Sequence, residues 1–373
     1  MRTPDATLEG HLAAALMALV SVASLSAAPA SAQAIIRVGE SVSVRFGVLL
    51  QTQAEFAERP NASGTGTTGY AEALFIRRAR LIMGGQVASN IFFFFQTDNP
   101  DLGRKTSAAN SLGSGPQLIN GEVEWRIDKA FNVIGGLFRV PYSRESMKAV
   151  ASLFEIDAQT FNSVQGSSMG WTVTNRDTGF QVRGYVLSDH LEYRVAATQG
   201  ARQPDSRNSF ALTARIQYNF FGTEVYNTPS YPGSYIDGKK MLTIGAAYQE
   251  QGTFKYASAD VFASIPVGPG IVEGTFQYQY LDGATMFPLL AHQNIAMIEA
   301  GYYATGPKVG PWARYEQVNY NGATSRNEER VWAGIGWFPF RHNFNVKGAY
   351  ERIMPKASVD RNQFVLQLQL YYF

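Results

Sequence analysis

Two basic side chains four residues apart, Arg144 and Lys148, stand with Glu145 between them in a long stretch without regular alternation. The stretch covers residues 136–179, and short alternating segments lie on both sides of it. A connection this long inside a compact domain is more often functional than filler. Residues four apart share one face of a helical turn, so both bases are predicted to act on the same passing anion.

Nine arginines form a second group, because alternation turns each of them toward the polar face of its segment. They are Arg45, Arg78, Arg80, Arg126, Arg139, Arg183, Arg194, Arg215 and Arg314. A guanidinium group binds oxyanions through a planar fork of donors, which suits phosphate, sulfate or carboxylate. The alternative is that each arginine pairs with an acid on the same face, such as Glu122 or Glu316, and only strengthens the wall.

The chain also carries one motif of enzymes, GSSMG at residues 166–170, which matches the G-x-S-x-G pattern of hydrolases. That motif requires a strand–turn–helix context, with an acid and a histidine following in order. In this chain it precedes a predicted strand, so we expect no catalytic residue, and a barrel-embedded hydrolase is the alternative from a different class. The four histidines lack metal-ligand spacing, and no cofactor motif precedes a helix. No cofactor or metal is therefore expected.

Composition restricts the class of protein. Aromatic residues make up 13% of the chain and mean hydropathy is −0.14. No apolar run after residue 30 reaches the length of a membrane helix. The remaining classes are a soluble all-β protein and a transmembrane barrel, in which polar residues alternate with apolar ones. The absence of cysteine excludes disulfides, and the net charge of +2 is too small to indicate nucleic-acid binding.

The chain divides into an export segment and one domain. Residues 1–32 are predicted to be a signal peptide, with an apolar core at 12–27 and an A-x-A cleavage site ending at Ala32. A hydrophobic anchor that stays attached is the alternative. Residues 33–373 are then a single β-barrel domain, in which residues 141–177 form the constriction loop.

Alternation with period two indicates strands that have one apolar and one polar face. About sixteen such segments follow one another, joined largely by short and long connections in turn, which predicts an all-β transmembrane antiparallel barrel with an inward-folded loop. Phe75 and Leu81 are predicted to face outward, while the apolar run at residues 91–95 leaves the phase undecided. Residues 222–239 are long where a short turn is expected, and residues 251–253 are short where a loop is expected.

A soluble β-sandwich would alternate in the same way. Aromatic residues near the strand ends, and Phe373 as the last residue, favour the barrel. The phase of the last strand places Phe373 opposite its outward set.

Several motifs together resemble the phosphate-selective porin O and P family. They are RRAR at 77–80, GLFRVPYSRE at 136–145, RDTG at 176–179, ARIQYN at 214–219, PWARY at 311–315 and VLQLQL at 365–370 before the terminal phenylalanine. The second of these is similar to the family signature G-x-F-K-x-P-F-S-x-E, with Arg139 and Tyr142 as replacements.

The resemblance implies a sixteen-stranded, usually trimeric barrel of the bacterial outer membrane that passes anions, with the loop after the fifth strand folded inward. It also implies that Phe373 serves as the signal for the barrel assembly machinery. Phosphate-selective members line the constriction with lysines, whereas this loop offers Arg144 and Lys148 beside acids. We therefore expect a porin for passive diffusion of small anionic or polar solutes. A non-selective diffusion porin is the alternative.

Overall fold

The computed structural model describes residues 35–38, 41–106, 109–110, 115–161, 175–201, 209–228, 230–283, 285–287, 290 and 292–373. The predicted signal peptide, residues 1–32, and the GSSMG motif at 166–170 lie outside the described residues. Residues 35–373 form one compact unit. In the described part of the chain no helix is long and apolar enough to cross a membrane.

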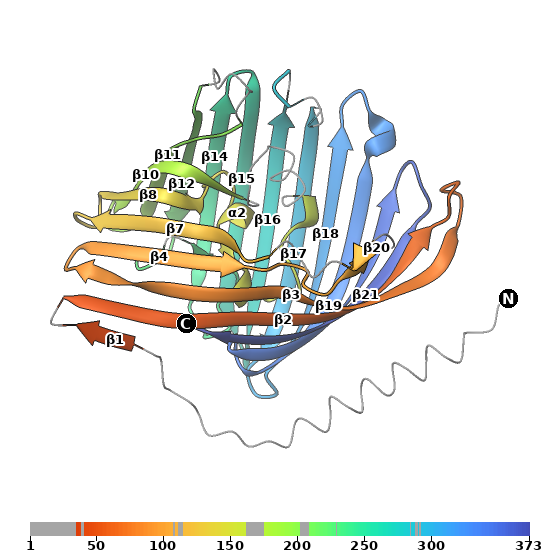
Figure 1. Cartoon of the computed structure of the whole chain (residues 1–373), viewed down its shortest axis with the longest axis horizontal. Helices are drawn as coiled ribbons and strands as arrows, with labels where there is room; N and C mark the ends of the chain where they lie inside the picture. The colour runs from red at the N-terminus through yellow and green to blue at the C-terminus, as the bar shows by residue number, and fades with distance from the viewer. Residues whose placement is uncertain are drawn as a thin grey trace. The chain divides into compact units, whose positions relative to one another are not determined.

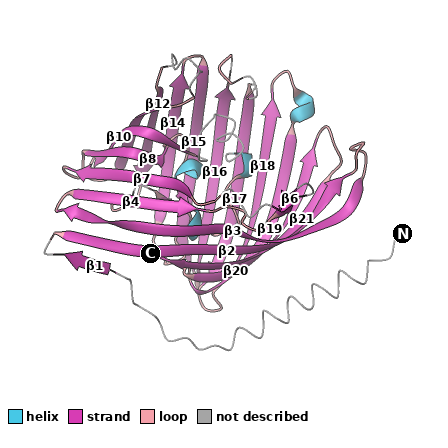
Figure 2. Cartoon of the chain, viewed as in Figure 1, coloured by secondary structure: helices cyan, strands magenta, loops and turns pink. Residues whose placement is uncertain are grey.

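Within the described residues, sixteen strands pair into one closed antiparallel ring, in which β21 returns to β2 (Figures 1 and 2). In order they are β2 (Val42–Pro60), β3 (Thr67–Ala88), β4 (Ile91–Asp98), β7 (Gln117–Arg126), β8 (Asn132–Arg139), β10 (Arg176–Val186), β11 (Leu191–Thr198), β12 (Ala211–Asn219), β14 (Met241–Gln251), β15 (Phe254–Val267), β16 (Gly270–Asp282), β17 (Gln293–Ala304), β18 (Val309–Tyr320), β19 (Glu328–Phe340), β20 (Phe344–Pro355) and β21 (Arg361–Tyr372). A short strand, β1 (Ile35–Val38), pairs with the first residues of β2. Closure leaves no open sheet edge, which a lipid environment requires.

Strand β12 shows why this sequence forms a barrel wall. Leu212 and Ile216 are 51% and 56% exposed on the outer face, whereas Thr213, Arg215 and Gln217 are buried on the inner face. An apolar exterior suits the hydrocarbon layer, and a polar interior suits a water-filled lumen. The predicted phase of this strand is confirmed.

The prediction for Phe75 is wrong, and a β-bulge is the reason. Gln51 of β2 pairs with Arg78 and the next residue, Thr52, pairs with Ile76, so Arg77 is the extra residue in β3. The bulge shifts the phase by one position, and Phe75 is therefore buried with 4% exposure while Leu81 is exposed as predicted. Arg77 and Arg78 consequently both bind one carboxylate of the loop, that of Asp157, at 2.9 and 2.6 Å.

Two segments run inside the ring. The predicted constriction loop, described up to residue 161 and again from 175, contains α2 (Arg144–Met147), β9 (Lys148–Ala149) and the 3-10 turn η1 (Val150–Ser152). The second is the connection between β12 and β14, which the sequence shows to be long at a position where the order of connections calls for a short turn. Its strand β13 (Tyr231–Pro232) pairs in parallel with β9.

Candidate functional site

A capping box starts the helical turn of the constriction loop. The Ser146 amide donates to Ser143 Oγ at 3.0 Å, and the Ser143 amide donates to Ser146 Oγ at 3.1 Å. Reciprocal bonds of this kind satisfy amides that a helix start leaves unpaired. Arg144 and Glu145 therefore leave the backbone in fixed directions shortly after the strand β8.

Arg144 is held by the second inward segment. Its guanidinium binds both oxygens of Glu224, at 2.6 and 3.1 Å, and its Cζ lies 3.9 Å from the ring centre of Phe262. Both side chains of the ion pair are fully buried. Burial disfavours the charged form of the arginine, but Glu224 outweighs this and raises the pKa of Arg144. The pair is thus a fixed link between the two segments.

Lys148 belongs to a different group of charges. Its Nζ lies 2.6 Å from Glu145, 3.4 Å from Glu155 and 3.6 Å from Glu299 of β17. Burial lowers the pKa of Lys148, yet these acids raise it above the ordinary value. The four-residue spacing therefore does not bring Arg144 and Lys148 together, because each base binds its own carboxylates.

Glu155 is a buried loop acid with both acids and bases as neighbours. Burial, together with the neighbouring Glu299, raises the pKa of Glu155 to about 7, although Lys148 and Arg314 oppose that rise. Arg314 of β18 lies 3.2 Å from Glu155 and 2.5 Å from Glu299. The loop is therefore joined to the wall by a network in which acids outnumber bases.

The ring of Phe154 anchors the part of the constriction loop that follows η1. Phe154 stacks on Phe338 at a centroid distance of 5.6 Å and an interplanar angle of 4°. The Phe154 ring packs directly on Gly301 and Gly310. A Cβ at either glycine would lie 2.3 Å from the ring, so neither position has room for a side chain. Two inward-facing glycines thus form the seat on which the loop packs.

The second inward segment was missed by sequence reasoning, although its unusual length was a visible signal. It adds hydrogen bonds from the Gly233 amide to Ser152 Oγ, 2.9 Å, and from Ser234 Oγ to the Ser152 carbonyl oxygen, 3.0 Å. The buried ring of Tyr231 lies under three guanidinium groups at 5.1 to 5.6 Å, those of Arg144, Arg194 and Arg215. The segment therefore supports the constriction loop from the end of the barrel that carries the short turns.

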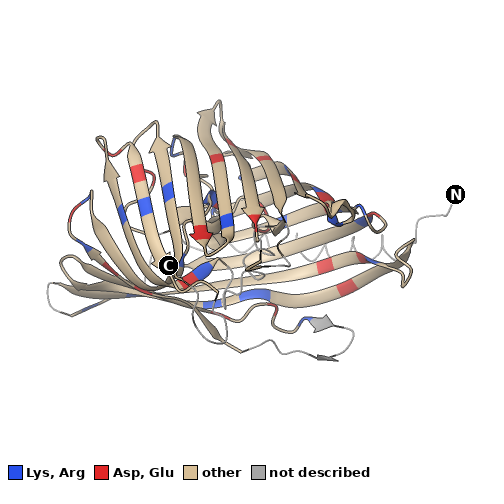
Figure 3. Ribbon diagram, turned by 90° about the horizontal axis from the view of Figure 1, so that it is seen from above, with Lys and Arg blue, Asp and Glu red and all other residues tan. Residues whose placement is uncertain are grey.

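Most predicted wall arginines have a carboxylate partner, and basic and acidic residues occur on neighbouring strands of the barrel (Figure 3). The pairs are Arg78–Asp157, Arg80–Asp98, Arg126–Glu124, Arg183–Glu124, Arg194–Glu192, Arg215–Asp260 and Arg314–Glu299, at 2.5 to 2.8 Å. Arg45 and Arg139 differ, because no carboxylate of the described residues lies within ion-pair distance of either. Arg139 donates to the Ser146 carbonyl oxygen at 2.9 Å, and Arg45 lies over the Phe373 ring.

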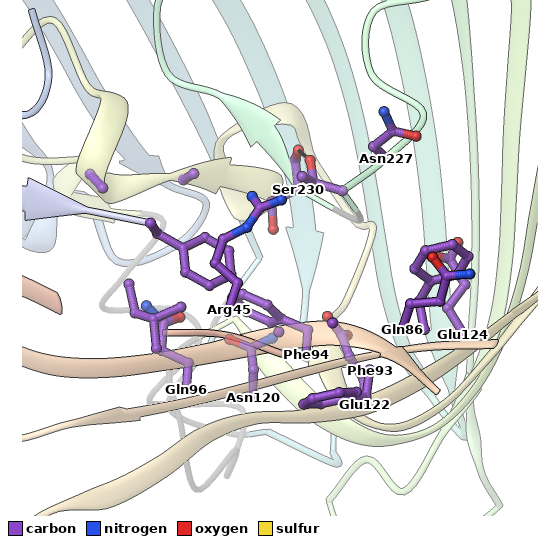
Figure 4. Close-up of a pocket in the computed structure, with 18 of the residues that line it drawn as sticks. Arg45, Gln86, Phe93, Phe94, Gln96, Asn120, Glu122, Glu124, Asn227 and Ser230 are labelled. Carbon is purple, nitrogen blue, oxygen red and sulfur yellow. Dashed lines mark hydrogen bonds between the residues drawn. The ribbon is translucent and has the colours of Figure 1, made fainter. Parts of the chain in front are cut away.

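A cavity of about 790 Å³ lies inside the wall formed by β3, β4, β7 and β8 (Figure 4). Its other side is closed by residues 149–152 of the constriction loop and by Asn227, Thr228, Ser230 and Pro232 of the second inward segment. Its lining contains five arginines and two glutamates, namely Arg37, Arg45, Arg80, Arg126, Arg139, Glu122 and Glu124. The cavity is therefore space for water and small solutes beside the loop, and bases exceed acids in its lining.

Comparison with known proteins gives one family and one fold. The family model described as phosphate-selective porin O and P matches residues 46–253, more than half of the chain. No curated protein matches.

Solved structures of similar fold include the Salmonella typhi protein OmpF in complex with daunomycin, with a TM-score of 0.62 and 11% identity over 91% of this chain and 100% of that one. An anion-selective porin from Comamonas acidovorans has a TM-score of 0.60 and 12% identity over 89% and 100%. The outer membrane channel DcaP of Acinetobacter baumannii has a TM-score of 0.57 and 11% identity over 90% and 99%.

Proposed function

Because the chain belongs to the phosphate-selective porin O and P family and is an outer-membrane porin, we propose that it passes small anions through the cavity beside its constriction loop. The observation that carries this proposal is the lining of that cavity, where five arginines face two glutamates. Basic side chains around a narrow, wet passage lower the energy of an anion and raise that of a cation. Porins are channels, so the barrel-embedded hydrolase is set aside.

Arg45 and Arg139 are the proposed determinants of anion preference. A base whose charge is already balanced by a bound carboxylate acts weakly on a third ion, whereas an unbalanced base acts fully. Arg144, Glu145 and Lys148 are proposed to hold the constriction in place through buried ion pairs. Inorganic phosphate is not singled out, because the described lumen offers no group of lysines at the loop.

The reversal potential across a potassium chloride gradient in a planar bilayer tests the proposal. We expect chloride preference in the natural protein. Reversing one charge at ~6 Å from the ion path changes the energies of an anion and a cation by about 1.4 kcal/mol each in water, in opposite directions. Arg139→Glu or Arg45→Glu should therefore lower the anion-to-cation permeability ratio about a hundredfold.

Arg352→Glu is the matched control, because Arg352 is half exposed and binds Asp360 in a connection between strands. It should leave the ratio unchanged. A natural protein without ion preference would contradict the proposal and would support the non-selective diffusion porin.

We further propose a homotrimer, export by residues 1–32 and assembly through Phe373. The trimer is supported by a neighbour of the same fold, Vibrio cholerae OmpT, whose structure is described as a trimer form. Electrophoresis without heating should show a band near three times the mass of the heated chain. Phe373→Ala should reduce the amount of folded barrel in the outer membrane, and an undiminished amount would contradict the assembly role.

A further inference from the structure

Strand β4 carries two phenylalanines where barrel alternation calls for polar residues. The phase of its apolar run is resolved by pairing with β7: Phe93 lies beside Val123 and Phe95 beside Gly121 on the outer face. Phe92 and Phe94 therefore face the lumen, beside Glu124 and Glu122. Phe94 packs against a buried cluster that includes Val150 and Leu153 of the constriction loop. Both rings nevertheless remain partly exposed in a polar lumen, where they could also meet a solute.

The last strand brings two more rings to the same place. Tyr371 and Phe373 follow the inward phase of β21, and both line the cavity. Phe373 meets Phe94 edge to face at 5.8 Å and 74°. The inward position of the terminal ring agrees with the phase predicted for the last residue, and it makes the C-terminus part of the cavity wall.

Guanidinium groups accompany these rings. Arg126 lies 3.7 Å from the ring centre of Phe92, and Arg45 lies 5.4 Å from that of Phe373. Arg139 lines the same cavity. Of the two acids in the lining, Glu124 is bound by Arg126 and Arg183. Glu122 is the second acid of the lining and lies beside Phe94 in the pairing of β4 with β7. The cavity thus offers apolar ring faces beside Arg45, which has no bound carboxylate among the described residues (Figure 4).

We infer that this cavity is a binding site for aromatic carboxylates, a step that rests on the proposed anion porin and names its preferred solute class. The carboxylate binds the guanidinium group of Arg45, which lies beside the Phe373 ring, through charge-assisted hydrogen bonds. The ring of the solute packs against Phe92, Phe94 and Phe373 in offset or edge-to-face contacts. The volume of about 790 Å³ lies within the usual range for small-molecule sites. Acetate and inorganic phosphate have no ring, so they can form only the charge-assisted hydrogen bonds and not the contacts with the phenylalanine rings.

Block of the chloride current through the full porin in a planar bilayer tests this site. Sodium benzoate is added on the side of the short turns, and sodium acetate is added in a parallel series. We expect benzoate to halve the current at a concentration about tenfold lower than acetate does. In Phe94→Ala the two concentrations should become nearly equal, because the ring contact contributes about that factor.

Phe95→Ala is the matched control, since it removes the same ring from the outer face of the same strand and should keep the tenfold difference. Phe94→Leu keeps an apolar side chain of similar size, and it should weaken benzoate block if the alanine variant does not fold. Equal block by benzoate and acetate in the natural protein, or an unchanged difference in both Phe94 variants, overturns the site. The reversal potential in potassium chloride separately tests the porin's anion preference, so the two failures are distinguishable.

Discussion

The basic side chains on the two sides of the lumen have different partners. On the packed side, from β12 to β20, buried ion pairs join neighbouring strands and the loop: Arg215 binds Asp260, Arg314 binds Glu299, and Lys148 binds three acids. On the cavity side, from β2 to β8, Arg139 donates to a backbone carbonyl and Arg45 lies over a ring. Both sides are rich in arginine, so the number of bases does not distinguish them.

The difference lies in the bases without a carboxylate. Arg78, Arg80 and Arg126 are paired on the cavity side as well, but Arg45 and Arg139, which have no bound carboxylate among the described residues, are both on that side. A buried ion pair costs desolvation and is retained where it fixes one arrangement, which on the packed side is the position of the loop. A base without a bound acid keeps its full effect on a passing ion. We infer that one side of the lumen positions the constriction and that the other side acts on the solute.

The largest expected effect comes from breaking the link between the two inward segments. Glu224→Gln leaves the buried Arg144 without its carboxylate, and loss of one partner of a buried pair costs about 3–5 kcal/mol. We expect the loop to leave its seat, which should raise the single-channel conductance and its noise. Recordings from single channels measure both quantities.

Asp360→Asn is the control for this change, because it breaks a half-exposed pair with Arg352 far from the loop. It should leave conductance and noise as they are. If Glu224→Gln conducts like the natural porin, the second inward segment does not hold the constriction.

A smaller effect is expected from filling the seat of Phe154. In Gly310→Ala the new Cβ would lie 2.3 Å from the Phe154 ring, and overpacking of this kind costs about 1–3 kcal/mol. Gly306→Ala is the matched control, since a Cβ there has no neighbour within 4 Å among the described atoms. Conductance should change in the first variant and stay constant in the second. Equal behaviour would show that packing of Phe154 does not set the pore size.

The third prediction compares the two sides directly. Lys148→Met combined with Glu145→Gln removes one buried base with its acid, and we expect the reversal potential to change little. Arg139→Gln removes a charge without a bound carboxylate, which changes the anion and cation energies by about 0.7 kcal/mol each in opposite directions, so it should lower the anion-to-cation ratio about tenfold, as expected for one charge at ~6 Å in water. The sequence predicts that Arg144 and Lys148 set the selectivity. A larger shift from the loop variant than from Arg139→Gln would favour that prediction.

The barrel could be predicted from the sequence because its constraint is local. A closed sheet in lipid requires apolar residues outside and polar residues inside at every second position, and β12 shows the pattern without fault. Phe75 was assigned to the wrong face because one extra residue, Arg77, shifts the phase, and alternation alone does not reveal a bulge.

The pairing inside the lumen could not be predicted, because it depends on residues far apart in the chain. Arg144 and its partner Glu224 are separated by 80 positions, and Glu224 lies in a connection that is long where a short turn is expected. Local spacing suggested that Arg144 and Lys148 share one face of a helix. The helix ends at Met147, so Lys148 lies just outside it. The direction of each basic side chain is then set by the carboxylate that it binds, Glu224 for Arg144 and Glu145 for Lys148.

The smallest expected effect is a pH dependence of the packed side. The pKa of Glu155 is raised to about 7 by burial and by Glu299, against Lys148 and Arg314. Its protonated form is therefore favoured in the native loop. The stability from this proton is fully present below about 4.5, the ordinary value, and is lost as the pH rises through about 7. We expect less channel noise at pH 5 than at pH 8.

Glu155→Gln should remove this difference, because the amide stays neutral at both pH values. Asp157 provides the opposite case in the same loop: burial raises its pKa, but Arg78 and Arg77 lower it far more, so it stays charged throughout this range. Asp157→Asn should increase the noise at pH 5 and pH 8 alike and leave the pH difference intact. If the Glu155→Gln porin keeps the full difference between pH 5 and pH 8, another group titrates, and the network of Glu155, Glu299, Lys148 and Arg314 holds the loop equally well in either protonation state.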